Sequence, residues 1–208
     1  MRRTSFLAAV VIAFTALPAF AQAPASAPPS APPTPIRGTV EKLADHTLTV
    51  KSRDGSSASV TLAPNVTVRT VVAKTLTDIK PGDKVAITSV PGPDGTRQAV
   101  EVHMLPASMP ANRLSEFPWD LRPNSLMTNA MAAQISDTPK GRMIKVTLNG
   151  RESEITVPPD TPIVGYGPGD VSLLKPGTTV FVLARKQADG SLGAAGVIAE
   201  KDGVKPPM

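Results

Sequence analysis

The sequence contains no cysteine. Disulfides and thiolate metal sites are therefore excluded, and the fold has to be stabilised by apolar burial alone. Aromatic residues are also scarce, at 3% of the chain, with one tryptophan and one tyrosine. Binding by aromatic stacking, which is common in barrels that hold oligonucleotides or sugars, has little surface available here.

A strong excess of one charge is missing as well. The chain has 22 basic and 17 acidic residues, for a formal net charge of +5, and the basic residues are spread along it. No basic run of the kind that marks a nucleic-acid face is present, so we expect no nucleic-acid partner. Beyond the N-terminal region no apolar run is long enough to span a bilayer, so we expect no transmembrane span in the mature chain.

The N-terminus has the pattern of a secretory signal peptide. Arg2 and Arg3 precede the apolar run 6–20, and Ala19-Phe20-Ala21 supplies small residues at a cleavage site. We predict a signal peptide over 1–21 and export to the periplasm or the medium. Residues 22–35 contain six prolines and no charge, which predicts a Pro/Ala-rich extended tether.

The strongest internal signal appears when the chain is compared with itself at an offset of 95 residues. Lys80-Pro81-Gly82 then lies over Lys175-Pro176-Gly177, and Asp94-Gly95 lies over Asp189-Gly190. The matches fall on turn residues and on inward-facing apolar residues, the positions that a fold constrains most. We therefore predict two copies of one module, at 36–103 and 128–203. They are joined by a connector, 104–127, and followed by a short tail, 204–208.

Each copy is predicted to consist of strands. Residues 47–51 alternate with a period of two and stop at Asp54-Gly55, a hairpin signal. In Lys80-Pro81-Gly82-Asp83, proline presets φ and glycine takes the positive φ of a tight turn. The predicted fold class is therefore all-β, with two tandem small OB-like β-barrels, or sandwiches, after the signal peptide and tether. Whether the copies form separate barrels or one body stays open.

These motifs resemble those of a known group of proteins. The pattern is carried by Gly38-Thr39-Val40, Leu48-Thr49-Val50, Asp54-Gly55, Leu76 to Val85 and Asp94 to Val102. Together with the segment 117–129 and the Pro206-Pro207-Met208 end, it resembles uncharacterised proteobacterial secreted proteins with tandem exported small OB-like β-barrel repeats of unknown function. The resemblance implies the fold, and it implies neither an activity nor ligand residues.

The connector has no counterpart at the 95-residue offset and holds Trp119, the only tryptophan. A connector of this length is usually functional or packed as a compact loop. Trp119 either anchors this loop in a groove between the modules or stacks on a ligand. The candidate binding residues are Trp119, its neighbours Asp120 and Arg122, and Tyr166 in the glycine-rich stretch 165–170.

One grouping of residues carries metal chemistry. Imidazole and thioether groups suit Cu(I), and the candidate ligands are His103, Met104, Met109, Met127 and Met131. Methionine is also a common gap filler at interfaces, and no Met-x-x-Met spacing occurs. We expect no resident cofactor, with copper as the alternative.

No catalytic constellation is evident. The two histidines, His46 and His103, lie far apart in sequence and neither has a neighbouring nucleophile motif. We predict a non-enzymatic binding or interaction module of the periplasm or the secreted fraction, with an envelope protein or an envelope polymer as partner. The alternative is a carrier of a small ligand or of copper, and a remote alternative is an envelope hydrolase. The oligomeric state stays open.

Overall fold

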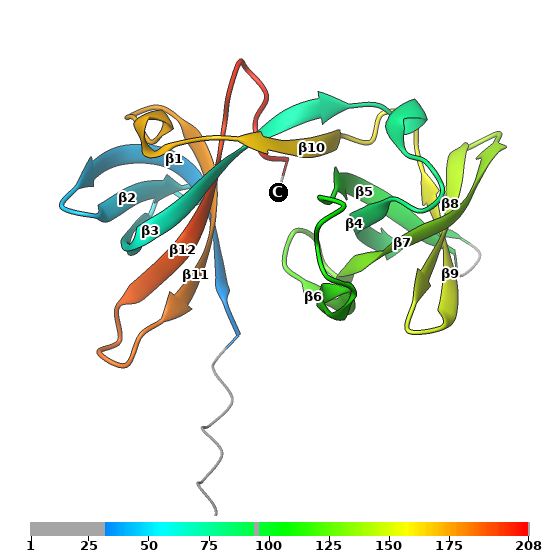
Figure 1. The fold of residues 1–208 in the computed structure, drawn as a ribbon, viewed down its shortest axis with the longest axis horizontal. Coiled ribbons are helices and arrows are strands. Elements are labelled where there is room, and N and C mark those ends of the chain that lie inside the picture. The colour runs from blue at the N-terminus through cyan, green and yellow to red at the C-terminus, as the bar shows by residue number, and fades with distance from the viewer. Residues whose placement is uncertain (1–31, 94–95, 208) are drawn as a thin grey trace, which may run out of the picture. The chain divides into compact units, whose positions relative to one another are not determined.

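The computed structural model describes residues 32–93 and 96–207 (Figure 1). The predicted signal peptide and residues 22–31 of the predicted tether lie outside this range. Within it the chain is built of strands, and its helical structure is confined to short 3-10 turns, which include η1 (Leu76–Asp78), η3 (Ala111–Arg113) and η4 (Val171–Leu173). The predicted all-β fold class is confirmed.

The strands form one continuous hydrogen-bonded sheet. They are β1 (Thr34–Ala44), β2 (Thr47–Ser52), β3 (Ser57–Lys74), β4 (Lys84–Pro91), β5 (Arg97–Met104), β6 (Ser115–Trp119), β7 (Ser125–Thr138), β8 (Gly141–Leu148), β9 (Arg151–Val157), β10 (Ile163–Pro168), β11 (Thr179–Lys186) and β12 (Leu192–Ala199).

Five of these strands close into a barrel. β1 and β2, and then β2 and β3, pair as antiparallel hairpins. β11 pairs with the other edge of β1 and with β12. The ring closes because β12 runs parallel to β3, from the pair Gly193 and Thr61 to the pair Ala199 and Thr70. A small β-barrel, as predicted, is therefore present.

The barrel combines the two ends of the chain. In Figure 1 its blue and cyan strands β1 to β3 stand beside the orange and red strands β11 and β12. The predicted module ranges 36–103 and 128–203 each contribute strands to it, so range 36–103 alone does not form this barrel. The first strand begins at Thr34, inside the predicted tether range.

The other strands continue the sheet. β4 pairs with β5 and β7, and β7, β8 and β9 follow as antiparallel neighbours. β9 also contacts β5 at two parallel pairs, Arg97 with Ile155 and Gln98 with Thr156. β6, which lies within the predicted connector, pairs with β7. β10 joins the two groups, because it pairs with the second half of β3 and with β5.

Two apolar clusters fill the structure. The first lies in the closed barrel and includes Leu48, Val50 and Val182. The second lies between β4, β5, β7, β8 and β9 and includes Ile87 and Ile144. Burial alternates along β2, as expected for a strand with one face in a core, whereas β4 is buried on both faces from Val85 to Ser89.

The elements recur at the spacing read from the sequence. η1 and η4, β4 and β11, and β5 and β12 each start 95 residues apart and have equal lengths. The turns of the two Lys-Pro-Gly motifs have the positive φ predicted for glycine, +92° at both Gly82 and Gly177. Asp54-Gly55 lies in the hairpin that joins β2 to β3, as predicted, with φ of +88° at Gly55.

Among the described residues, no helix has the length and apolar character needed to cross a bilayer.

The close approach of β1 and β2 gives a test of the barrel. A Cβ on Gly38 would run into the carbonyl oxygen of Lys51, whereas a Cβ on Gly196 would lie 3.7 Å from its nearest neighbour, the carbonyl oxygen of Thr67. Gly38→Ala should therefore lower the free energy of unfolding by about 1–3 kcal/mol, the usual cost of overpacking. Gly196→Ala is the control and should leave it nearly unchanged. Urea unfolding curves measure both, and equal stability of the two variants would contradict the register of β1 and β2.

Candidate functional site

A row of residues crosses three neighbouring strands. Met127 on β7 lies opposite Thr88 on β4, which lies opposite Glu101 on β5. Their neighbours in sequence, Ile87 and Val102, point into the second apolar cluster. Because side chains alternate along a strand, the row lies on the opposite face of the sheet from that cluster. This face is covered too, since Met127, Thr88 and Glu101 are all buried.

Glu101 and His103 lie on this face two residues apart on β5. Each is only 1% exposed. Thr88 Oγ1 donates a hydrogen bond of 2.6 Å to Glu101 Oε1. The other carboxylate oxygen, Oε2, is 3.6 Å from His103 Nε2, too far for a good hydrogen bond. Neither of these two atoms has a hydrogen-bond partner in the described part of the chain.

Tyr166 completes the cluster from β10. This strand runs parallel to β5, with Val164 opposite His103. The Tyr166 hydroxyl is 3.1 Å from His103 Nδ1, and the two rings stack with centroids 5.7 Å apart. Burial, and then the charge of Glu101, raise the pKa of the phenol. The phenol is therefore neutral at ordinary pH and can donate to Nδ1, which places the proton of a neutral imidazole on Nε2, facing Glu101.

The scaffold itself does not require this polar cluster. At the 95-residue spacing, Glu101 corresponds to Gly196, His103 to Ile198, Thr88 to Leu183 and Tyr166 to Val71. The same structural positions thus carry no ionisable group in the other copy. A buried carboxylate and imidazole cost free energy unless they are paired, so these two residues are candidates for a role other than packing.

No family model, no curated protein and no solved structure matches this chain. The functional argument therefore depends on the geometry of the site.

A second cluster surrounds Trp119 at the end of β6. The Arg37 guanidinium lies 5.3 Å from the ring centroids of both Trp119 and Phe181. The same guanidinium makes two hydrogen bonds to Asp120, of 2.8 and 2.7 Å. Phe117 packs edge-on against the indole at 5.8 Å. Arg37 and Phe181 belong to the closed barrel and Trp119 to the predicted connector, so this cluster ties the connector to the barrel.

The remaining predicted site residues lie elsewhere. Met104 packs against the second apolar cluster, and Met131 is 41% exposed. The carbonyl oxygen of Met109 accepts a hydrogen bond from Lys84 Nζ. Arg122 lines a small pocket beside Pro158 and Pro162. Of the five predicted metal ligands, the structure brings only His103 and Met127 to the buried cluster.

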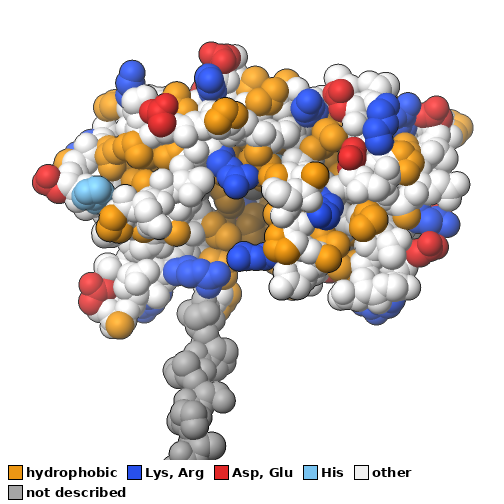
Figure 2. Space-filling view, in the orientation of Figure 1, with side chains coloured by type: hydrophobic (Ala, Val, Ile, Leu, Met, Phe, Trp, Pro, Cys, Tyr) orange, Lys and Arg blue, Asp and Glu red, His pale blue; other side chains and the backbone are white. Residues whose placement is uncertain are grey.

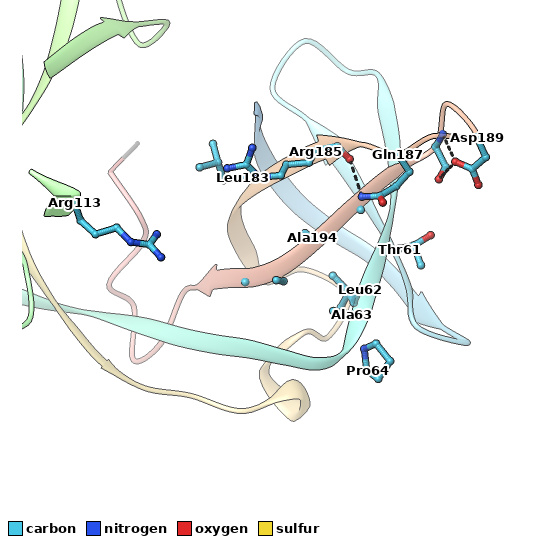
Figure 3. Close-up of a pocket in the computed structure, with 14 residues that line it drawn as sticks. Thr61, Leu62, Ala63, Pro64, Arg113, Leu183, Arg185, Gln187, Asp189 and Ala194 are labelled. Carbon is cyan, nitrogen blue, oxygen red and sulfur yellow. Dashed lines mark hydrogen bonds between the residues drawn. The ribbon is translucent and has the colours of Figure 1, made fainter. Parts of the chain in front are cut away.

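A groove of about 830 Å³ runs along the outside of the closed barrel (Figure 3). Its floor is the small-residue stretch 193–196 on β12. Leu62, Ala63 and Pro64 from β3 line one side, and Leu183 and Arg185 from β11 line the other. Figure 3 shows Arg113 reaching toward the groove from the connector. At the 95-residue spacing, Thr88 and Glu101 of the buried row correspond to Leu183 and Gly196, which line this open groove.

Sequence reasoning missed Glu101, Thr88, Arg37 and Phe181. A signal for the first was available, because Glu101 and His103 are two residues apart in a predicted strand and therefore share a face. Comparison with Gly196 and Ile198 at the repeat spacing would have marked both as departures from the module. Arg37 and Phe181 carried no such signal, since their contact with Trp119 joins distant parts of the chain.

The single tyrosine makes the buried cluster measurable. Because the chain has one tyrosine, the near-ultraviolet absorbance of tyrosinate reports on Tyr166 alone. Its pKa is raised above the ordinary value of 10.0, so the folded protein should show little tyrosinate at pH 10, where the unfolded chain is half ionised. The stabilising effect of the neutral phenol is present below pH 10 and is lost as the pH rises further. Half ionisation at pH 10 in the folded protein would contradict the packing of the half-buried Tyr166 ring against His103.

Removing the indole tests whether Trp119 is a structural anchor. Trp119→Ala deletes both the ring contact to Phe181 and the cation–π contact to Arg37, and should lower the free energy of unfolding by about 2–4 kcal/mol. Phe117→Ala, which removes a ring that is 36% exposed, is the control and should cost less. Thermal unfolding followed by circular dichroism measures both. Unchanged stability in Trp119→Ala would leave ligand stacking as the role of the indole.

Proposed function

We propose that the protein is a non-enzymatic binding module of the cell envelope that holds an extended, acidic segment of another envelope protein. The groove on β3, β11 and β12 carries this proposal. It is open along the barrel, and stretch 193–196 leaves its floor without bulky side chains. The equivalent stretch of the other copy reads Gln98-Ala99-Val100-Glu101, and the pocket beside it measures only about 260 Å³.

Charge favours an acidic ligand. Arg113 and Arg185 both line the groove, and neither guanidinium forms an ion pair with any described acidic residue. The one lining carboxylate, Asp189, already accepts hydrogen bonds from the backbone and hydroxyl of Ser191. Elsewhere on the face shown in Figure 2, basic and acidic side chains are interspersed. Unpaired guanidinium groups in a groove are suited to binding carboxylates.

The lining favours a polypeptide over a glycan. Pro64 and the 39% exposed Leu183 offer aliphatic contact for apolar side chains, and the described lining of the groove has no aromatic ring for a sugar to stack on. The chemistry also supports binding over catalysis. Ser191 is the only lining serine, its hydroxyl donates to Asp189 at 2.6 Å, and the described lining contains neither histidine nor lysine to act as a base.

We further propose that the two predicted modules exchange their last two strands. β11 and β12 pair with β1 and β3, and β4 and β5 pair with β7 and β9. β5 and β12 are equivalent by spacing, and each pairs in parallel with strands that are equivalent as well. β3 and β10 pair antiparallel, and Val71 lies opposite Tyr166, its own counterpart. This arrangement is expected if two copies of one module share a two-fold axis and trade their last two strands. Export to the periplasm or the medium rests on the N-terminal sequence pattern.

Binding of a labelled extended peptide of alternating glutamate and leucine residues tests the groove. We expect fluorescence polarisation to show binding of this peptide and none of the matched lysine and leucine peptide. Arg185→Gln should weaken binding about tenfold, the loss of one charge-assisted contact. Gly196→Leu should abolish it by filling the groove floor. Lys186→Gln is the matched control, because Lys186 is the next residue of β11 and does not line the groove. Equal binding of both peptides, or binding unaffected by either groove variant, would refute the proposal.

A further inference from the structure

The buried cluster has two unpartnered atoms that face one another. Glu101 Oε2 and His103 Nε2 are 3.6 Å apart, each on a side chain that is 1% exposed, and neither has a hydrogen-bond partner among the described residues. Buried polar atoms are nearly always satisfied, so each exception needs a reason. We propose that these two atoms are the first ligands of a buried copper site, with the thioether of Met127 as the adjoining donor.

The separation fits an ion held between the two atoms. Metal bonds to imidazole nitrogen and carboxylate oxygen are about 2.0–2.2 Å long. Two ligands at that distance and 3.6 Å apart subtend an angle of about 120° at the metal, within the range for three- and four-coordinate sites. Both atoms point into covered protein, so an ion there would be removed from water.

The donor set selects the metal. Among the described residues, no three His, Cys, Asp or Glu side chains are grouped so that they could hold a metal ion, which disfavours a zinc site built from those ligands alone. Sulfur is connected to the pair through one hydroxyl, because Met127 Sδ is 3.8 Å from Thr88 Oγ1, which donates to Glu101 Oε1. Nitrogen and oxygen ligands bind Cu(II) more tightly than the other divalent first-row metals, and thioether sulfur favours Cu(I). The set therefore suits copper in both oxidation states.

The surrounding contacts hold the ligands in place. Thr88 fixes the carboxylate through Oε1 and leaves Oε2 free. Tyr166 contacts the imidazole at Nδ1 and leaves Nε2 free. Contacts of this kind orient metal ligands, and their loss typically costs 10- to 100-fold in affinity. With copper bound at Nε2, the imidazole would carry its proton on Nδ1, and Nδ1–H would donate a hydrogen bond to the Tyr166 hydroxyl oxygen, a role open to a neutral hydroxyl.

The experiment measures copper binding by the full chain. The protein is refolded with Cu(II), because the site is buried, and excess metal is removed on a desalting column. We expect one copper per chain, a higher melting temperature than the metal-free protein, and an electron paramagnetic resonance spectrum showing imidazole nitrogen. Glu101→Gln, which keeps the shape of the side chain, should weaken binding at least tenfold, and Met127→Leu should weaken binding of Cu(I) more than that of Cu(II).

The second histidine provides the control. His46 is exposed in the turn between β1 and β2, and it is the only other histidine of the chain. His46→Gln should retain copper and the imidazole signal, which in that variant arises from His103 alone, so the assignment does not depend on the folding of a His103 variant. The groove variant Arg185→Gln should retain copper as well, which separates this site from the peptide-binding function.

Three results would overturn the proposal. The first is no retained copper in the refolded native sequence, which would leave Glu101 and His103 as a buried acid–base pair. The second is loss of the imidazole signal in His46→Gln, which would place the copper at the surface. The third is unchanged affinity in a folded Glu101→Gln protein.

Discussion

The parallel pairing of β12 with β3 is the contact on which the rest of the structure depends. It turns an open sheet into a ring and removes the free edges that β3 and β12 would otherwise expose. Parallel neighbours cannot be joined by a tight turn. The segment between these two strands contains β4 to β11, and the residues of the buried cluster and of the connector belong to this segment.

Two strands that are related by the 95-residue spacing present different surfaces. Position 101 on β5 and position 196 on β12 are equivalent by spacing and lie on strands with the same kind of partners. A glutamate at the first gives a buried polar cluster, and a glycine at the second gives the floor of a groove. If the chain consists of two copies of one module, as proposed above, side chains at equivalent positions account for the difference between the cluster and the groove.

Local features of the fold were accessible from the sequence, and long-range ones were not. Alternation and glycine turns indicated strands and hairpins, and the 95-residue offset aligned the two Lys-Pro-Gly turns, which have the same positive φ at Gly82 and Gly177. Strand partners could not be found this way, because local alternation does not say whether β1 pairs with β11 or with another strand. In the site, His103, Met127 and Tyr166 were identified by residue type. Glu101 was passed over, because a glutamate in a polar-alternating strand is normally solvated.

Closing a barrel with the first and the last strands has a kinetic consequence. While the chain emerges from its N-terminus, β1, β2 and β3 form early, but the strands that complete their ring begin only at Thr179. Until then the hairpins present unpaired edges and an uncovered apolar face, the condition in which chains aggregate. Folding of this protein is therefore dominated by non-local contacts and is intrinsically slow. A partner that covers the unpaired edges of β1 and β3, or export of the chain before it folds, would therefore protect this protein from aggregation more than it would protect a barrel whose neighbouring strands are all consecutive in sequence.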